Sequence, residues 1–124
     1  MSLKYDCFLR NKIKEINVSL LNKEPDMYEL IGSVRDLFSS SYNNNLIANT
    51  ETIEELWGTL FNVFCGSSFY ENKFDAIFAM SDIYLYAKRK NINLNLDSLK
   101  EWRGKNNVST STEEILECVD DILT

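Results

Sequence analysis

The stretch TIEELWGTLFNVF, residues 52–64, decides the fold of this chain. Its apolar residues cover much of the circumference of a helix, a pattern typical of a helix that packs on several sides. They are Leu56, Trp57, Leu60, Phe61, Val63 and Phe64. Thr52 and Glu55 have the spacing of a capping box, in which two side chains satisfy backbone N–H groups of the first turn. We therefore expect a central helix that is capped at Thr52 and ends at Gly66.

Two amphipathic helices are predicted before this central helix, because apolar residues recur there every three or four positions. The first passes through Leu9 and Leu20, and the second covers residues 27–38. Pro25 separates them, since proline disfavours helical backbone at the residue before it. A polar stretch, residues 39–45, follows the second helix and has the composition of a turn.

Three further helices are predicted after the central one. One runs from about Asn72, as its cap, to Lys90, and a short one covers residues 97–103 and stops at Gly104. The last begins at a second capping box, formed by Ser111 and Glu114.

Residues Ile92–Leu96 alternate apolar and polar side chains, as a strand would. A single strand without a partner is unstable, so we expect an extended connector whose apolar side lies on the core. The length of 124 residues suits one domain. The sequence therefore predicts an all-α single domain, residues 1–124, built as a bundle of five to six short helices.

The composition excludes several kinds of chemistry. The chain has no histidine, so it lacks a Ser-His or Cys-His nucleophile pair and an imidazole metal ligand. Its three cysteines, Cys7, Cys65 and Cys118, form no CxxC unit and are expected to be buried free thiols. Cys65 in particular is expected to be buried and inert beside Phe64. We expect no catalytic residue, no metal site and no cofactor.

The apolar runs are too short to span a bilayer, and the N-terminus lacks the apolar region of a signal peptide. A cytoplasmic location without a membrane partner is the expectation. The basic stretches at 88–90 and 102–105 follow helix ends, where cations stabilise the helix dipole without any ligand. With a sequence pI of about 4.6, nucleic acid is not an expected partner.

The net charge of −6 conceals four alternating blocks. Residues 1–23 carry +3, residues 24–87 carry −8, residues 88–105 carry +4 and residues 106–124 carry −5. Acidic surfaces attract basic partners and repel nucleic acid and anionic membranes. The same pattern is also what the solvated outside of any helical bundle requires, so charge alone leaves both interpretations open.

The acidic blocks supply the candidate binding residues, together with tyrosines, which are enriched at binding hot spots. The first set is Glu51, Glu54, Glu55, Glu71, Asp75, Asp82, Tyr42 and Tyr70. The second set is Glu113, Glu114, Glu117, Asp120 and Asp121.

In size and charge the chain resembles the small acidic immunity proteins that bacteria make against their own bacteriocin or contact-dependent-inhibition toxins. The residues behind this resemblance are the acidic stretch 51–82 and the tail 113–121, with Tyr42 and Tyr70 nearby. The resemblance implies stoichiometric inhibition of a basic nuclease domain, with carboxylates in the place of substrate phosphates. Complementary charge would then speed association and fix orientation.

Two alternatives remain open. The first is an adaptor or a secretion-chaperone-like helical dimer that uses an apolar helix face. The second rests on Glu113-Glu114-x-x-Glu117-x-x-Asp120, which is similar to the Glu-rich motif of helical, Mg-dependent nucleotide pyrophosphohydrolases. Glu114, Glu117 and Asp121 share a helix face and would converge on one cation. The oligomeric state is not predicted.

Overall fold

The computed structural model of the chain describes residues 4–39 and 47–124. They form α1 (Asp6–Leu21), α2 (Tyr28–Phe38), α3 (Thr50–Gly66), α4 (Tyr70–Arg89), α5 (Asp97–Lys105) and α6 (Glu113–Leu123). No strand occurs within these described ranges, and the predicted all-α bundle is confirmed. In the same ranges, none of the helices has both the length and the apolar character that crossing a bilayer requires.

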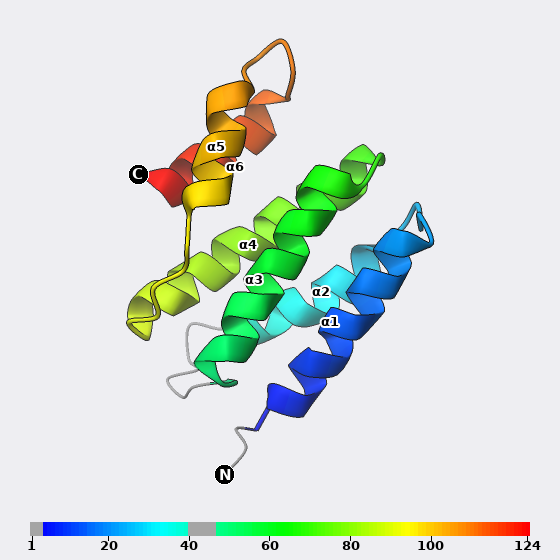
Figure 1. Cartoon of the computed structure of the whole chain (residues 1–124), viewed down its shortest axis with the longest axis vertical. Helices are drawn as coiled ribbons and strands as arrows, with labels where there is room; N and C mark the ends of the chain where they lie inside the picture. The colour runs from blue at the N-terminus through cyan, green and yellow to red at the C-terminus, as the bar shows by residue number, and fades with distance from the viewer. Residues whose placement is uncertain (1–3, 40–46) are drawn as a thin grey trace.

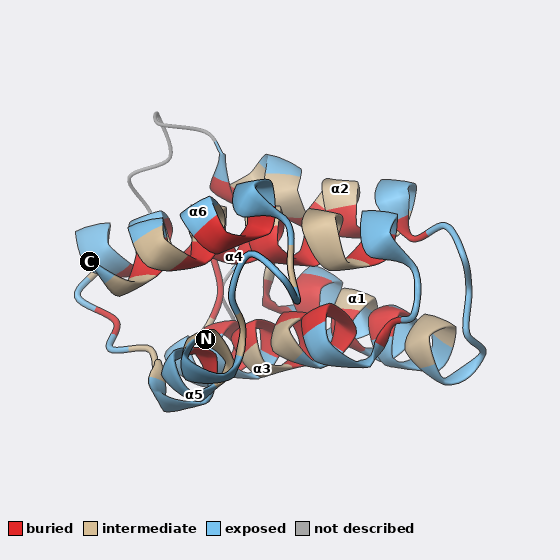
Figure 2. Ribbon diagram, turned by 90° about the horizontal axis from the view of Figure 1, so that it is seen from above, coloured by how far each residue is buried: buried red, intermediate tan, exposed pale blue. Residues whose placement is uncertain are grey.

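The helices lie in two layers, with α1, α3 and α5 in one and α2, α4 and α6 in the other (Figure 1). Buried residues face the space between the layers, and the exposed residues cover the outside (Figure 2). α3 packs most extensively on α4, and α2 and α6 each pack against α4. α3 therefore has the central position expected from its apolar circumference, with α4 as its counterpart in the second layer.

The connector between α4 and α5 follows the expectation for residues Ile92–Leu96. It is neither helix nor strand, Ile92 is buried, and Leu94 and Leu96 pack half-buried against the core. α5 then returns to the first layer, where the ring of Trp102 lies 4.7 Å from that of Phe64 in α3.

α1 and α4 end in the same way, with a residue in the left-handed conformation just after the helix. Lys23 has a φ of 56° and Asn91 a φ of 57°. After α4 the N–H of Ile92 donates to the carbonyl of Ala87 at 2.9 Å, and after α1 the N–H of Glu24 donates to that of Ser19 at 3.0 Å. This is the six-to-one hydrogen bond of a Schellman motif, which satisfies carbonyls that the helix leaves free.

The predicted capping box at Thr52 is wrong. α3 begins three residues earlier than predicted, at Thr50 after Asn49, and Thr52 lies buried inside its first turns. The Thr52 hydroxyl donates instead to the carboxylate of Asp6 in α1, at 2.7 Å. As a cap, the Thr52 hydroxyl would accept a hydrogen bond from a backbone N–H of the first turn. Here it donates to a charged carboxylate of another helix, a stronger interaction than a bond between neutral groups.

The predicted cap at Asn72 is also wrong, because α4 begins at Tyr70 and Asn72 is buried. Its side-chain oxygen accepts from the N–H of Met27 at 3.0 Å, and its amide donates to the carbonyl of Glu24 at 2.8 Å. Asn72 therefore holds the loop between α1 and α2 against the start of α4.

The start of α6 and the end of α5 also differ slightly from the prediction. The cap of α6 is Thr112 rather than Ser111, and its hydroxyl accepts from the N–H of Ile115 at 3.4 Å. α5 continues through Gly104 to Lys105. The side chain of Asn106 donates to the carbonyl of Trp102 at 2.8 Å, which satisfies the last turn without a glycine stop.

Candidate functional site

The two layers differ strongly in charge. The helices α2, α4 and α6 hold ten carboxylates and four cationic side chains, for a net charge of −6. The helices α1, α3 and α5 hold seven carboxylates and six cationic side chains, for a net charge of −1. We call α2, α4 and α6 the acidic layer. The fold thus places three helices with most of the excess negative charge on one side of the molecule, although they are separated along the chain.

Three predicted carboxylates lie along one side of α4. Glu71, Asp75 and Asp82 have the spacing i, i+4 and i+11, which places them on one face of the helix. Across from them, the guanidinium of Arg35 in α2 pairs with Asp82 at 2.8 Å. It also lies 5.2 Å from the centre of the Phe78 ring, a cation–π distance. These contacts join α2 to α4 on the acidic layer.

An open groove of about 420 Å³ follows the same junction, at the side of α2 that faces α4. The polar and charged residues that line it, with one glycine, are Tyr28, Glu29, Gly32, Ser33, Arg35, Asp36, Ser39 and Asp75. Burial of its carboxyl group raises the pKa of Asp75 above the ordinary value, and the negative charge of Glu71 adds to this effect, while Arg35 opposes it. The groove therefore contains a carboxyl group that is partly desolvated and lies near another negative charge.

The second predicted set lies on α6, and Tyr70 joins it to the first. The Tyr70 hydroxyl lies 3.1 Å from the Thr112 hydroxyl and donates to the carboxylate of Glu114 at 3.3 Å. Asp120 pairs with Arg103 of α5 at 2.7 Å, so its charge is compensated. The other four carboxylates of this set are exposed: Glu113, Glu114, Glu117 and Asp121.

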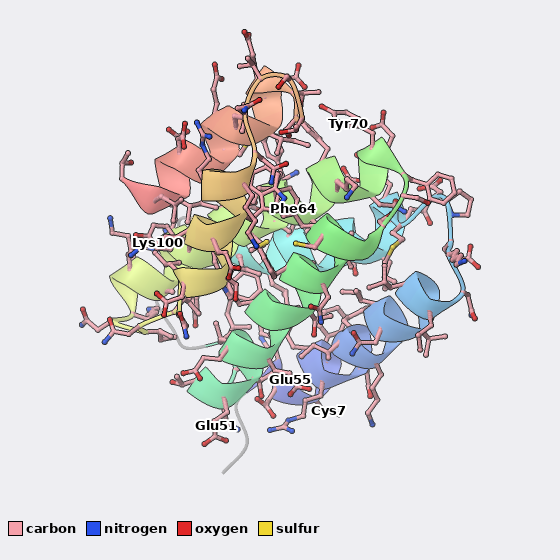
Figure 3. The ribbon with its side chains drawn as sticks, turned by 45° about the horizontal axis from the view of Figure 1, so that its top comes forward. Cys7, Glu51, Glu55, Phe64, Tyr70 and Lys100 are labelled. Carbon is pink, nitrogen blue, oxygen red and sulfur yellow. The ribbon has the colours of Figure 1, made fainter. Side chains whose placement is uncertain are left out.

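Glu51, Glu54 and Glu55 lie in the other layer, at the exposed beginning of α3. Figure 3 shows Glu51 and Glu55 beside the start of α1, at the opposite end of the molecule from Tyr70. A hydrogen bond to Asp6 raises the pKa of Arg10, and the charges of Glu55 and Glu51 add to this. The structure therefore does not bring these three carboxylates together with those of α4. The remaining predicted residue, Tyr42, lies outside the described residues.

Within residues 4–39 and 47–124, no three carboxylate or thiol side chains form a group that could hold a metal ion. In particular, Glu114, Glu117 and Asp121 do not converge in this way, although they share a helix face. The described residues thus offer no arrangement for the Mg²⁺-binding role considered for α6.

The expectation of buried thiols is wrong. Cys7 and Cys65 are exposed, and Cys118 is half-buried. Cys65 follows the buried Phe64 directly, and successive residues of a helix point about 100° apart, so the next side chain turns toward solvent. Partial desolvation raises the pKa of the Cys65 thiol, and desolvation and nearby carboxylates raise that of Cys118. Both thiols therefore favour the neutral, weakly nucleophilic form.

Sequence reasoning missed two cationic residues that shape this region. Arg35 and Lys73 are the two basic residues of the acidic block 24–87, and that isolation is the signal that could have singled them out. Arg35 forms the bridge to Asp82 described above. Lys73 donates to the carbonyl of Phe64 at 3.0 Å and so caps the C-terminal end of α3. Only Arg35 therefore belongs to the groove.

Comparison with known proteins yields no relative, since no family model, no curated protein and no solved structure matches this chain.

Proposed function

We propose that this protein acts by binding a basic protein partner through the acidic layer, as an inhibitor of the immunity-protein type. Its partner would be a nuclease toxin whose active site the acidic surface covers. The observation that supports the proposal is the net charge of −6 on α2, α4 and α6, against −1 on the other three helices. A surface that a partner recognises by charge needs such one-sided placement, whereas solvation of a bundle does not.

The one-sided placement of negative charge is expected to affect the rate at which the chain associates with a basic partner. Nuclease active sites attract phosphates with positive charge, and a carboxylate-rich face presents comparable negative charge at the same positions. Complementary potentials steer the encounter and raise the association rate at low salt. Glu71 and Asp75 are well placed for this, because Arg35 pairs with Asp82 rather than with either of them.

The test requires a basic nuclease toxin from a gene that neighbours this one, purified as its nuclease domain. We expect the chain to inhibit nuclease activity at one-to-one stoichiometry, with an association rate that falls steeply as salt rises. The double variant Glu71→Gln/Asp75→Asn should lower that rate about tenfold and flatten its dependence on salt. The matched control, Glu51→Gln/Glu54→Gln, removes two carboxylates from the other layer and should leave the rate nearly unchanged.

Two results would contradict the proposal. One is the absence of inhibition of the adjacent toxin, or of binding to any basic nuclease. The other is an equal effect of the two double variants, because binding would then not distinguish the layers.

A helical dimer is a second candidate, because self-association would cover large apolar side chains that are exposed in the single chain, among them Leu21, Leu85 and Val108. Sedimentation equilibrium separates the two functions. A dimeric adaptor or chaperone would self-associate at micromolar concentration, whereas an inhibitor of this type would remain monomeric.

A further inference from the structure

The groove of about 420 Å³ beside α2, which we call the α2 groove, owes its open form to small residues. Gly32 and Ser33 lie in the middle of α2 and line it. A Cβ atom added at Gly32 would meet nothing within 4 Å beyond its chain neighbours and the local helix backbone. Glycine is unfavourable inside a helix, so α2 itself gains nothing from Gly32, whereas the open space of the groove depends on it.

Three carboxylates line the α2 groove and have no partner within residues 4–39 and 47–124. Glu29 and Asp36 lie on α2, seven positions or about two helical turns apart, and Asp75 belongs to α4. None of the three forms a hydrogen bond or an ion pair with another residue in this part of the chain. Asp26 and Glu71 add further negative charge near Asp75. The lining of the groove is therefore more negative than cationic.

Arg35 is the cation among the described residues that line the α2 groove, and its guanidinium is already engaged. It pairs with Asp82 at 2.8 Å and lies 5.2 Å from the centre of the Phe78 ring. A guanidinium suits such a site because it is planar, bonds to carboxylates and stacks on aromatic rings. The groove offers the same two kinds of group to a second guanidinium, since Tyr28 lines it beside the carboxylates and is 68% exposed.

We propose that the α2 groove receives an arginine side chain of the basic partner; this inference rests on the proposed function and names the chemical group that the acidic layer recognises. The guanidinium would donate to the carboxylates of the groove and lie against the ring of Tyr28. A lysine side chain fits less well, because its ammonium group has no planar face and cannot form two parallel hydrogen bonds with one carboxylate.

A side chain seated in the groove has a different kinetic effect from the charge of the acidic layer. Long-range attraction acts before contact and raises the association rate, whereas a seated side chain mainly slows dissociation. Gly32→Leu separates the two effects, because it fills the groove and leaves every charge in place. The matched control is Gly58→Leu in α3, in the other layer, where an added Cβ atom also meets nothing within 4 Å. Leucine favours helix more than glycine does, so both variants should remain folded, and circular dichroism checks this.

The first experiment measures the binding of two capped peptides to the whole chain by amide shift titration at constant salt. One peptide alternates arginine with glycine and the other lysine with glycine, at equal length and charge. We expect the arginine peptide to bind about three- to fivefold more tightly, with shift changes in α2 rather than in α3. Gly32→Leu should weaken its binding about fivefold, and Gly58→Leu should leave it unchanged. Tyr28→Ser, at an exposed position, should abolish the preference for arginine over lysine.

The second experiment uses a nuclease toxin that the chain inhibits. Gly32→Leu should raise the dissociation rate of the complex about tenfold and leave the association rate unchanged, because the charges are the same. Gly58→Leu should change neither rate. If inhibition persists and Gly32→Leu dissociates no faster than the native chain, the inference is wrong although the proposed function stands.

Three outcomes of the peptide experiment would also overturn the inference. Equal binding of the arginine and lysine peptides would show attraction by charge alone and leave the proposed function standing. Equal effects of Gly32→Leu and Gly58→Leu would exclude the α2 groove as the site. Free arginine amide that binds as tightly as the arginine peptide would make a small cation the occupant. Failure of the proposed function is read separately, from the absence of toxin inhibition.

Discussion

Asp6 holds the beginning of α1 against the beginning of α3. Its buried carboxylate accepts hydrogen bonds from the side chain of Arg10 at 2.7 Å, the hydroxyl of Thr52 at 2.7 Å and the N–H of Asn49 at 3.0 Å. The hydrogen bonds from Arg10, then Thr52 and Asn49, lower the pKa of Asp6 from the ordinary 3.8 to about 2. Each of these donors stabilises the ionised form and so favours folding when the carboxylate is charged.

This lowered pKa predicts a specific loss of stability in acid. The contribution of Asp6 is fully present above pH 3.8 and is lost as the pH falls toward 2, because the folded carboxylate must then be protonated. Asp6→Asn should lower the melting temperature at pH 7 and reduce its dependence on pH between those values. Glu15→Gln, at an exposed position of α1, serves as the control. The prediction would be contradicted if the melting temperatures of the native chain and Asp6→Asn changed equally with pH.

Lys23 offers a second test at the residue scale. Its φ of 56° lies in the left-handed region, where a Cβ atom is unfavourable and glycine is not. Lys23→Gly should therefore increase the free energy of unfolding by about 0.5–1 kcal/mol, measured by urea denaturation. Asn91→Gly should increase the free energy of unfolding by less, because asparagine tolerates this conformation better than lysine does. Equal gains at the two sites would contradict this explanation.

At the scale of the elements, the side chain of Asn72 links two connecting segments to the first turn of α4. Besides its bonds to Met27 and Glu24, its amide lies 3.3 Å from the hydroxyl of Ser67. One buried side chain thus connects the α1–α2 loop, the α3–α4 turn and the first turn of α4. This arrangement determines where α4 begins relative to α2, and therefore how Asp75 faces the groove.

Asn72→Ala should lower the free energy of unfolding by about 2–3 kcal/mol, since it leaves the buried N–H of Met27 and the part-buried carbonyl of Glu24 without their partners. The control is Asn62→Ala, at an exposed position of α3, where a change of less than about 0.5 kcal/mol is expected. Urea denaturation measures both. A loss at Asn72 no larger than the loss at Asn62 would show that water replaces its hydrogen bonds.

At the scale of the whole molecule, the acidic layer stores electrostatic repulsion. Ten carboxylates with four cations on three neighbouring helices repel one another over distances comparable to the Debye length. The same placement that suits a basic partner therefore reduces the stability of the free protein, and it makes that stability sensitive to salt.

The melting temperature should accordingly rise by a few degrees between about 10 mM and about 300 mM sodium chloride, as repulsion is screened. Glu117→Lys in α6 should raise the melting temperature at low salt. Its matched control is Glu54→Lys, which alters the fifth residue of α3, as Glu117 is the fifth of α6. The rise in melting temperature should be larger for Glu117→Lys than for Glu54→Lys. An equal rise would show that the layers do not differ in electrostatic repulsion.

Much of the helical structure can be predicted from the sequence, because the spacing of apolar residues is a local property. The central helix around Trp57 and the connector at Ile92 follow from such spacing and are confirmed. The candidate site could be predicted only in part. Local reasoning selected the carboxylates of α4 as candidates, but it grouped those of α3 with them, because distance along the chain carries no information about layers.

The sequence by itself determined that the chain forms a bundle of five to six helices, which face most of them bury and the charge that each one carries. These properties depend on residues within a few turns of one another. The tertiary structure alone decided that α2, α4 and α6 share a layer, that Arg35 of α2 pairs with Asp82 of α4, and that Thr52 and Asn72 bond across helices. The physical reason is that these features arise from contacts between residues more than 40 positions apart, which depend on how the helices pack.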